Sequence, residues 1–449
     1  MKKRDILREK PSKLFFSYLL PSISSTLVTS IYIFVDTVMI GKGVGEDGIA
    51  ALNIILPVFG VLYGLGVLFG VGGGVLMSVA NGAGNHEEAH GYFSSALVCA
   101  VVSSALCAIV TVIFFEPLMM AMGADSTTYP LVYEYGIYIA YGSPLFLFTN
   151  FLQAFVRNDK APRRAMVGVI TGGITNVILD YVFIFPMDMG MAGASIATVI
   201  GNSVTIVILL THFLSRANTM RFMISKVSVS RAVSIIKSGV PSFLTEVASS
   251  VVILMFNLQL LKYVGKTGVT VYGIISNSTI IAMSLFNGVA QAAQPLIASS
   301  FGAGLDERVG KFRRYGIATA GLVGAVLTLT GVIFNEPVVW IFLEPAETVL
   351  DMARPAIAIY FISLVFMGVN VFSATYFQSV IKPAKSLAIS LLRGVVLNTA
   401  LVFVLPLLFD VTGIWLTVPV TEAIVFVISV VMYRQGKNTA KPDGQRLNA

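Results

Sequence analysis

Five acidic side chains interrupt the long apolar stretches of this 449-residue chain, and they are the residues best suited to do chemistry there. They are Asp36, Glu134, Asp180, Glu246 and Glu422. Placing a carboxylate at the centre of a bilayer costs roughly 2.5–3.5 kcal/mol, so an acid within a membrane span indicates a function. The chemistry that such a group offers is the reversible binding of a proton or a cation.

Asp36 and Asp180 are the strongest candidates among these acids. Both lie in the outer third of their predicted spans, 14–40 and 165–186, in the same half of the chain. Asn176 lies one helical turn before Asp180 on the same face, where it could hydrogen-bond either carboxyl group. Burial and a like-charged neighbour both favour the protonated form of a carboxyl group, which suits proton exchange near neutral pH. The alternative is a permanent structural pair, bonded to Tyr, Ser or Thr hydroxyl groups.

The other three acids have weaker cases. Glu246 lies in the inner third of its predicted span, five residues after Pro241, and could assist protons, sodium or a cationic substrate. Glu422 lies near mid-depth in the last span, and Glu134 lies near an outer end, where an interfacial role suffices. For Glu246 and Glu422 a purely structural role stays open.

The elements that must position these acids are membrane-spanning helices. Charged residues are 12% of the chain against roughly 25% in soluble proteins, and 56% of the residues are hydrophobic. Crossing the bilayer takes about 20 residues. The predicted spans are 14–40, 50–79, 92–115, 129–156, 165–186, 192–214, 239–263, 270–298, 315–335, 354–380, 384–408 and 412–433. The sequence therefore predicts an all-α polytopic membrane protein with twelve transmembrane helices.

The two halves of the chain repeat each other with a constant offset of 220 in the numbering. Leu20-Pro21-Ser22 returns as Val240-Pro241-Ser242, Gly82-Ala83-Gly84 as Gly302-Ala303-Gly304, and Glu116-Pro117 as Glu336-Pro337. Six spans per half return the chain to its starting side, so the repeats are parallel. We expect an N-lobe at 1–214, a cytoplasmic linker at 215–238, and a C-lobe at 239–449 that ends in a basic tail. Duplicated bundles usually form a pathway, which predicts a transporter.

The acids do not follow this repeat. At the offset of 220, Asp36 corresponds to Phe256 and Glu246 to Thr26. Asn176 corresponds to Asn398 at an offset of 222, but the same offset pairs Asp180 with a valine. The scaffold is duplicated and the charge is not, so we expect the N-lobe to carry the main coupling site.

The distribution of basic residues predicts the orientation. With a cytoplasmic N-terminus, 26 of the 30 Lys and Arg residues fall inside, and Lys42, Lys262, Lys266 and Arg354 remain outside. This bias follows the positive-inside rule. We expect a multi-pass protein of the plasma (inner) membrane with both termini in the cytoplasm.

One apparent metal motif is better explained otherwise. His86-Glu87-Glu88-Ala89-His90 matches the HExxH pattern of zinc proteases. It falls in a short predicted cytoplasmic loop, and the repeat has no histidine at the corresponding Asp306-Glu307-Arg308-Val309-Gly310. We expect no metal site and no catalytic residue, and interpret both segments as polar interfacial helices.

Several motifs, taken in order, resemble those of the multidrug and toxic compound extrusion (MATE) transporters. They are Pro21 with Val35-Asp36-Thr37, Asn176-x-x-x-Asp180, Thr198, and Gly239-x-Pro241-x-x-x-x-Glu246. The resemblance covers nearly the whole chain and is greatest to the bacterial DinF and MepA-like branch. It implies two six-helix lobes arranged as a V, and cation-coupled drug export by alternating access.

The resemblance also implies a coupling site. Asp36 would be the principal coupling carboxylate, with Asp180 and Asn176 as its hydrogen-bond partners. Thr198 would line the same site, and Pro21 would mark a hinge in the first span.

Two parts of the family pattern are less well defined in this sequence. A tyrosine in the fourth span belongs to the family's network, and Tyr135 and Tyr138 both fit. In the NorM branch an aspartate of span ten joins the span-seven glutamate in a sodium site. Here no acid occurs between Asp351 and Asp410, which leaves Glu246 without that partner.

We therefore expect an antiporter rather than an enzyme, with no cofactor besides a coupling ion, H⁺ or else Na⁺. The expected substrates are small amphipathic organic cations, and the expected surroundings are membrane lipid, without nucleic acid, around a monomer. A flippase for lipid-linked oligosaccharides shares a related fold, but its pyrophosphate calls for several basic residues, and only Arg393 lies within a span. A scaffold or metalloenzyme lacks a credible set of ligands.

Overall fold

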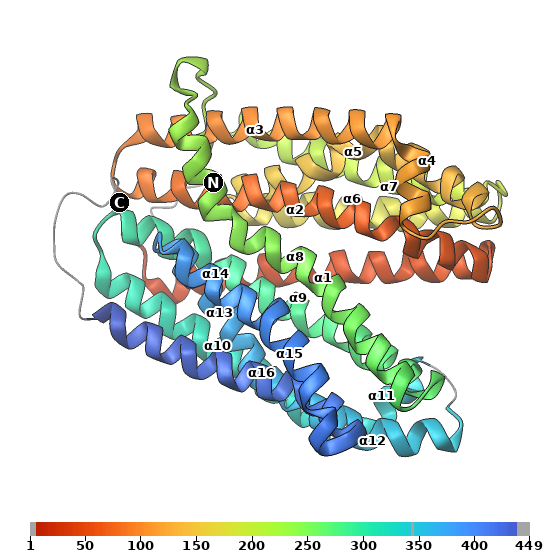
Figure 1. Cartoon of the computed structure of the whole chain (residues 1–449). Coiled ribbons are helices and arrows are strands. Elements are labelled where there is room, and N and C mark those ends of the chain that lie inside the picture. The colour runs from red at the N-terminus through yellow and green to blue at the C-terminus, as the bar shows by residue number, and fades with distance from the viewer. Residues whose placement is uncertain (1–5, 343–344, 438–449) are drawn as a thin grey trace. The chain divides into compact units, whose positions relative to one another are not determined.

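The computed structural model describes residues 6–342 and 345–437, and every regular element in these ranges is a helix (Figure 1). Twelve segments are long and apolar enough to cross a membrane, which confirms the predicted number of spans. The protein is a multi-pass membrane protein. Most of the predicted basic C-terminal tail lies outside the described residues.

The first six spans form the first half of the repeat. They are α1 (Pro11–Gly43), α2 (Glu46–Gly82), α3 (His86–Ile113), α5 (Tyr129–Asn158), α6 (Pro162–Ile184), and α7 (Gly190–Leu210) with the short helix η1 (Thr211–Leu214). The short helix α4 (Phe115–Ala121) connects α3 to α5.

The last six spans follow the short helix η2 (Ile224–Lys226). They are α8 (Val229–Tyr263), α9 (Lys266–Gly302), α10 (Asp306–Ile333), α12 (Glu347–Phe361) with α13 (Ser363–Ser379), α14 (Pro383–Leu391) with η3 (Leu392–Val396) and α15 (Leu397–Val404), and α16 (Pro406–Lys437). The helix α11 (Asn335–Phe342) occupies the place in the second half that α4 has in the first.

The backbone repeats as the sequence does. Residues with positive φ occur in matching turns of the two halves, at offsets between 220 and 222 in the numbering. The pairs are Gly45 and Gly265, Gly84 and Gly304, Lys160 and Ile381, and Asp188 and Asp410. Positive φ is uncommon for residues other than glycine, so its recurrence at Lys160, Asp188 and their counterparts reflects a shared backbone design. The predicted duplication is therefore present in the structure of the connections as well as in the spans.

Contacts divide the chain into two compact units, Met1–Glu246 and Val247–Ala449. The first unit has an apolar core that includes Ile55, Phe115 and Phe146. The second has a core around Phe286 and Trp415. The division falls within α8, after the predicted linker at 215–238.

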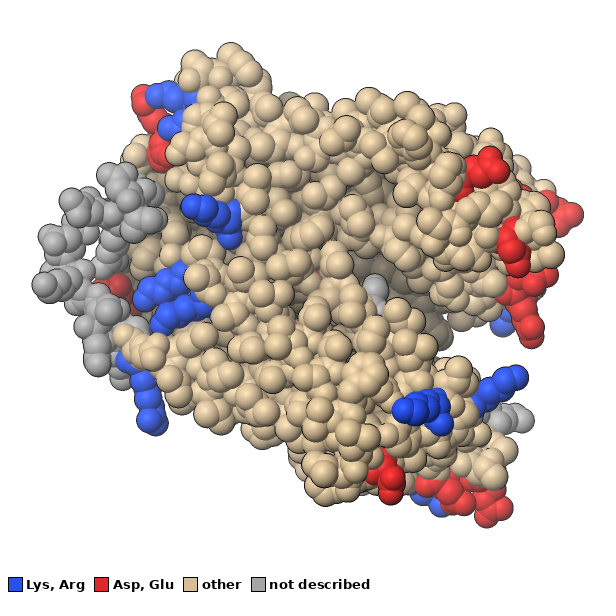
Figure 2. Space-filling view, viewed as in Figure 1, with Lys and Arg blue, Asp and Glu red and all other residues tan. Residues whose placement is uncertain are grey.

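The surface along the helices is largely apolar. Large side chains are exposed at many positions on the spans, among them Leu20, Leu106, Val207, Leu322 and Val427. In the space-filling view, charged side chains gather toward the helix ends and uncharged surface lies between them (Figure 2). Side chains of this kind, in a band along the helices, are suited to contact with lipid.

Polar contacts hold the segment before α8 against the rest of the first unit. Asp159 accepts hydrogen bonds from the Thr219 backbone N–H (2.8 Å) and hydroxyl group, and its Oδ2 lies 2.8 Å from His212 Nε2. Both Asp159 and His212 are buried. A satisfied carboxylate between two segments holds them together, because breaking either contact would leave a buried charge unpaired.

The HExxH segment takes part in the same attachment. Glu88 accepts two hydrogen bonds from Arg231, at 3.0 and 2.7 Å, and Glu87 forms an ion pair with Lys226 at 2.7 Å. His90 Nε2 lies 3.1 Å from the carbonyl oxygen of Thr219. These residues thus bind the segment before α8 and the first turn of α8.

Candidate functional site

Two acids from different helices meet inside the first unit. Asp36 of α1 and Asp180 of α6 lie close enough for their carboxyl groups to interact directly. Asp36 is 8% exposed and Asp180 is fully buried. Asp36 Oδ1 and both carboxylate oxygens of Asp180 have no well-formed hydrogen bond within the described part of the chain. Two acids this close favour the sharing of a proton, since both cannot readily ionise together.

Neutral polar groups extend this site toward α7 and α5. Asn176, one turn before Asp180, is buried and lies beside its carboxyl group. Its Nδ2 donates to Thr198 Oγ1 at 3.3 Å. The Thr198 hydroxyl group in turn interacts with the buried side chain of Tyr135. The structure therefore brings together Asp36, Asp180, Asn176, Thr198 and Tyr135.

Close packing of α6 on α7 sets the position of this polar group. A Cβ atom on Gly172 would overlap the hydroxyl group of Thr205 and the carbonyl oxygen of Gly201. A Cβ atom on Gly201 would lie 2.9 Å from Asn176 Cβ. Glycine at both positions lets the helices approach until Asn176 and Thr198 can bond.

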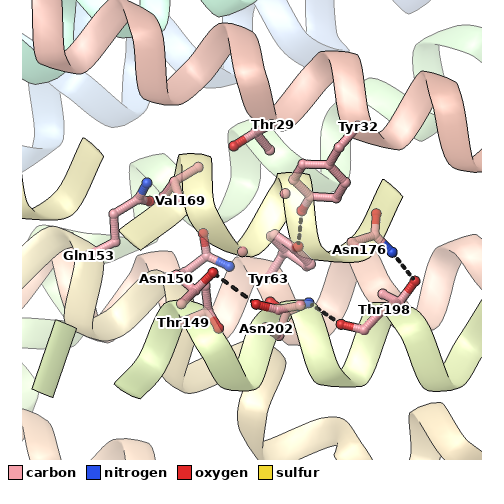
Figure 3. Close-up of a pocket in the computed structure, with 14 residues that line it drawn as sticks. Thr29, Tyr32, Tyr63, Thr149, Asn150, Gln153, Val169, Asn176, Thr198 and Asn202 are labelled. Atoms are coloured by element: carbon pink, nitrogen blue, oxygen red, sulfur yellow. Dashed lines mark hydrogen bonds between the residues drawn. The ribbon is translucent and has the colours of Figure 1, made fainter. Parts of the chain in front are cut away.

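Asn176 and Thr198 also line a small polar pocket in the first unit (Figure 3). The Tyr32 and Tyr63 hydroxyl groups bond each other at 3.1 Å, and Asn202 donates to the carbonyl oxygen of Thr198 at 2.9 Å. Asn150 is among the other residues that line the pocket. Its volume is about 30 Å³, enough for a water molecule, which needs about 10–15 Å³.

The remaining predicted residues of the first unit lie in different environments. Of the two candidate tyrosines, Tyr135 faces the acid pair, whereas Tyr138 is 40% exposed. Pro21 is buried within an unbroken α1, and its carbonyl oxygen accepts a bond from Ser25 Oγ at 2.8 Å. Glu134 lies near the start of α7, where its carboxylate faces the Ala192 backbone N–H at 3.5 Å.

Glu246 of α8 lies apart from the acid pair. Its side chain is exposed, and the pocket residue within its electrostatic range is Tyr63. Tyr63 bonds Tyr32, which lies one helical turn before Asp36.

Glu422, the second predicted acid outside the first lobe, has a different environment. Arg393 donates to Glu422 Oε1 from Nε at 3.1 Å and from Nη2 at 2.8 Å. Asn370 Nδ2 donates to Glu422 Oε2 at 2.7 Å. The acid of the second unit thus has a resident cation, and the single basic residue within a span that the pyrophosphate-binding alternative could use already carries a carboxylate partner.

The chain can now be placed in a family. It is a helical membrane protein of two repeats, and the described part of the first repeat holds a buried pair of acids with no ion-pair partner. The MatE family model matches residues 21–182 and 241–404, so the chain belongs to the MATE family.

Relatives of similar length match over most of both chains. The chain is 27% identical over 406 residues to the multidrug export protein MepA of Staphylococcus saprophyticus, covering 90% of this chain and 89% of that protein. It is 25% identical over 414 residues to MepA of Staphylococcus aureus strain MSSA476, covering 92% and 91%.

Solved structures share the fold. A multidrug resistance MATE family transporter in its outward-facing conformation superposes with a TM-score of 0.91 at 20% identity, covering 97% of this chain and 98% of that one. A MATE structure in complex with MaL6 gives a TM-score of 0.91 at 21% identity, with the same coverage. The predicted family and fold class are confirmed.

Sequence reasoning missed the pocket beyond the acid pair. Tyr32 lies one turn before Asp36, and Asn202 one turn after Thr198, so helical spacing alone could have indicated both. Tyr63 and Asn150 come from other helices, α2 and α5, and only the packing of the helices brings them to the site.

Proposed function

We propose that this MATE family protein is a proton-coupled antiporter that exports amphipathic, often cationic drugs across the plasma membrane by alternating access. The observation that carries this proposal is the Asp36–Asp180 pair, which is buried in the first unit with three oxygens lacking a well-formed bond. Its relatives named as multidrug export proteins support the choice of substrate class.

The geometry supports a simple cycle for the coupling ion. A proton that reaches the pair from outside is shared by Asp36 and Asp180 and cancels one negative charge. Loss of this charge changes which hydrogen bonds are favoured between α1 and α6. Asn176 of α6 is already bonded to Thr198. The first unit then holds a cationic substrate less strongly, since the attraction between opposite charges has been removed.

Release of the substrate and return of the proton to the cytoplasm complete the antiport. The Tyr32–Tyr63 contact and the polar pocket beyond it offer hydroxyl and amide groups on the inner side of the acid pair. Cytoplasmic termini, as the distribution of basic residues predicts, would make this direction of transport an efflux.

A reconstituted system tests this function. The purified protein is placed in proteoliposomes, and uptake or release of an organic cation dye is followed under an imposed proton gradient or an imposed Na⁺ gradient. We expect transport driven by the proton gradient, lost in Asp36→Asn, and retained in Asp47→Asn, which makes the same change at an exposed acid of α2. Full coupled transport by Asp36→Asn would remove the acid pair from the mechanism, and transport driven only by Na⁺ would assign the other ion.

A further inference from the structure

An ion pair inside the second unit has no part in the coupling cycle described above. Arg393 and Glu422 lie on spans α14–α15 and α16, and their side chains are 10% and 2% exposed. Burying two charges is costly, and a well-packed apolar pair of similar size is often equally stable. Ionisable residues at such positions in membrane spans usually mark a pathway or binding function.

The local backbone is also unusual at this point. Leu392–Val396 forms a π-helical turn, η3, in which the Leu397 N–H bonds to the Leu392 carbonyl five residues back. Asn398 Nδ2 donates to the carbonyl oxygen of Arg393 and supports the widened turn. Turns of this type are rare in proteins, and those that do occur are often found at functional sites.

The hydrogen bonds leave one side of the guanidinium group available. Glu422 Oε1 binds the edge formed by Nε and Nη2, and Asn370 occupies the other carboxylate oxygen. Nη2 also donates to Met283 Sδ at 4.0 Å, and Nη1 has no hydrogen-bond partner among the described residues. A guanidinium group can bind a carboxylate through its two-nitrogen Nη1–Nη2 end while its side edge stays paired.

In the repeat, the pair corresponds to residues that are next in sequence to two glycines lining the first unit's pocket. At the offset of 222, Arg393 and Glu422 correspond to Thr171 and Ile200, which adjoin the pocket-lining glycines Gly172 and Gly201. Met283 corresponds to Tyr63 of the pocket at the offset of 220. Where the first unit has neutral hydroxyl and amide groups, the second has a paired arginine.

We infer that Arg393 is a specificity-determining residue of the proposed exporter, where its guanidinium group binds a carboxylate carried by a zwitterionic substrate. This inference rests on the export function proposed above. Glu422 holds the guanidinium group in place through its Nε edge, and the substrate carboxylate binds the Nη1–Nη2 end. Because the ion pair has no net charge, one carboxylate is tolerated, and the positive group of a zwitterion balances it. A pyrophosphate brings more negative charge than a single paired arginine can offset.

A matched pair of dyes separates this inference from the export function itself. Rhodamine 110 carries a free carboxyl group, and rhodamine 123 is its methyl ester and hence a simple cation. Efflux of both is measured in proteoliposomes for the wild type, for Arg393→Lys, and for the double variant Arg393→Met with Glu422→Gln. The double variant leaves no unpaired charge in the bundle, so a loss of transport through misfolding is avoided.

We expect the wild type to export both dyes. In the double variant, export of the acid dye relative to the ester should fall by about tenfold or more, as for the loss of a charged hydrogen-bonded contact. Arg393→Lys keeps the charge without the two-nitrogen end and should give an intermediate ratio.

Two results would overturn the inference. One is an acid-to-ester ratio that is unchanged in the double variant, which would leave the ion pair a purely structural role. The other is a wild type that exports only the ester, which would reject a carboxylate site while leaving the export function intact. If the wild type exported neither dye under any ion gradient, the proposed function itself would fail.

Discussion

The two units use the same scaffold to hold their buried acids in opposite ways. In the first unit, Asp36 and Asp180 face each other beside hydroxyl and amide groups, and within 6–342 and 345–437 neither forms an ion pair with a basic residue. In the second, Glu422 is held by Arg393 and Asn370. An acid with a resident cation has little use for a proton or a metal ion, whereas two acids that share one site gain from binding either. Under the proposed function, this difference assigns ion coupling to the first unit.

Duplication explains how this division of roles is possible. Each unit provides the same helical framework, including matching turns such as Lys160 and Ile381. Framework residues keep the repeat, while side chains inside the bundles have diverged. In the proposed function one unit carries an exchangeable charge and the other a fixed one. The predictions below test this contrast, from the largest expected effect to the smallest.

Removing either acid of the first unit should abolish coupling without harming the fold. Asp180→Asn keeps the size of the side chain and removes the group that shares the proton. Proton-driven dye efflux in proteoliposomes should fall to the level of empty liposomes. Unfolding temperature should stay within a few degrees of the wild type, because neutralising one of two like charges relieves repulsion. Coupled efflux at the wild-type rate would show that the pair is structural.

The same kind of substitution in the second unit should mainly affect stability. Glu422→Gln leaves the Arg393 charge buried and unpaired, which costs about 3–5 kcal/mol. We expect a clearly lower unfolding temperature, measured by tryptophan fluorescence in detergent, and partial recovery when Arg393→Met is added. Equal stability of Glu422→Gln and the wild type would mean that the ion pair does not hold a charge that needs compensation.

Spacing of the first unit's helices can be perturbed at one glycine. In Gly172→Ala the new methyl group meets Thr205 and the carbonyl oxygen of Gly201, so α6 and α7 must separate. Overpacking of this kind costs about 1–3 kcal/mol and moves Asn176 away from Thr198. Efflux should drop severalfold, while Gly60→Ala, whose Cβ would meet nothing within 4 Å, should be unaffected. Similar rates for the two variants would argue against a role for this spacing.

The smallest effect should come from the tyrosine beside the acids. Tyr135→Phe removes the hydroxyl group that interacts with Thr198. A polar contact of this kind is worth about 1 kcal/mol, or about fivefold in an equilibrium constant. The expected result is a modest loss of proton-driven efflux, with Tyr138→Phe as an exposed control three residues away. A larger loss in Tyr138→Phe than in Tyr135→Phe would reverse the assignment of the span-four tyrosine.

Sequence reasoning predicted the framework well because the membrane simplifies it. Each span must be long and apolar, and basic residues and the repeat mark where spans end, so twelve segments could be located without side-chain detail. The depth of Asp36 and Asp180 along their spans also indicated that they lie at one level, and the structure puts them side by side. These arguments depend only on rise per residue and chain direction.

Lateral packing was harder to predict. Tyr135 and Tyr138 are three residues apart, nearly one helical turn, so spacing left both open, and only the neighbouring helices distinguish the buried from the exposed one. The Arg393–Glu422 contact joins two different helices, and the π-helical turn at Leu392–Val396 changes the direction in which Arg393 points. No helical periodicity in the sequence reveals such a turn.

The most direct test of the contrast between the units is to count the protons that leave the protein when an organic cation binds. The purified protein is held in weakly buffered detergent solution with a pH indicator, and rhodamine 123 is added to the wild type, to Asp36→Asn, and to the double variant Arg393→Met with Glu422→Gln. We predict proton release by the wild type and the double variant and none by Asp36→Asn. Release that persists in Asp36→Asn but disappears in the double variant would place the coupling site in the second unit and contradict the account.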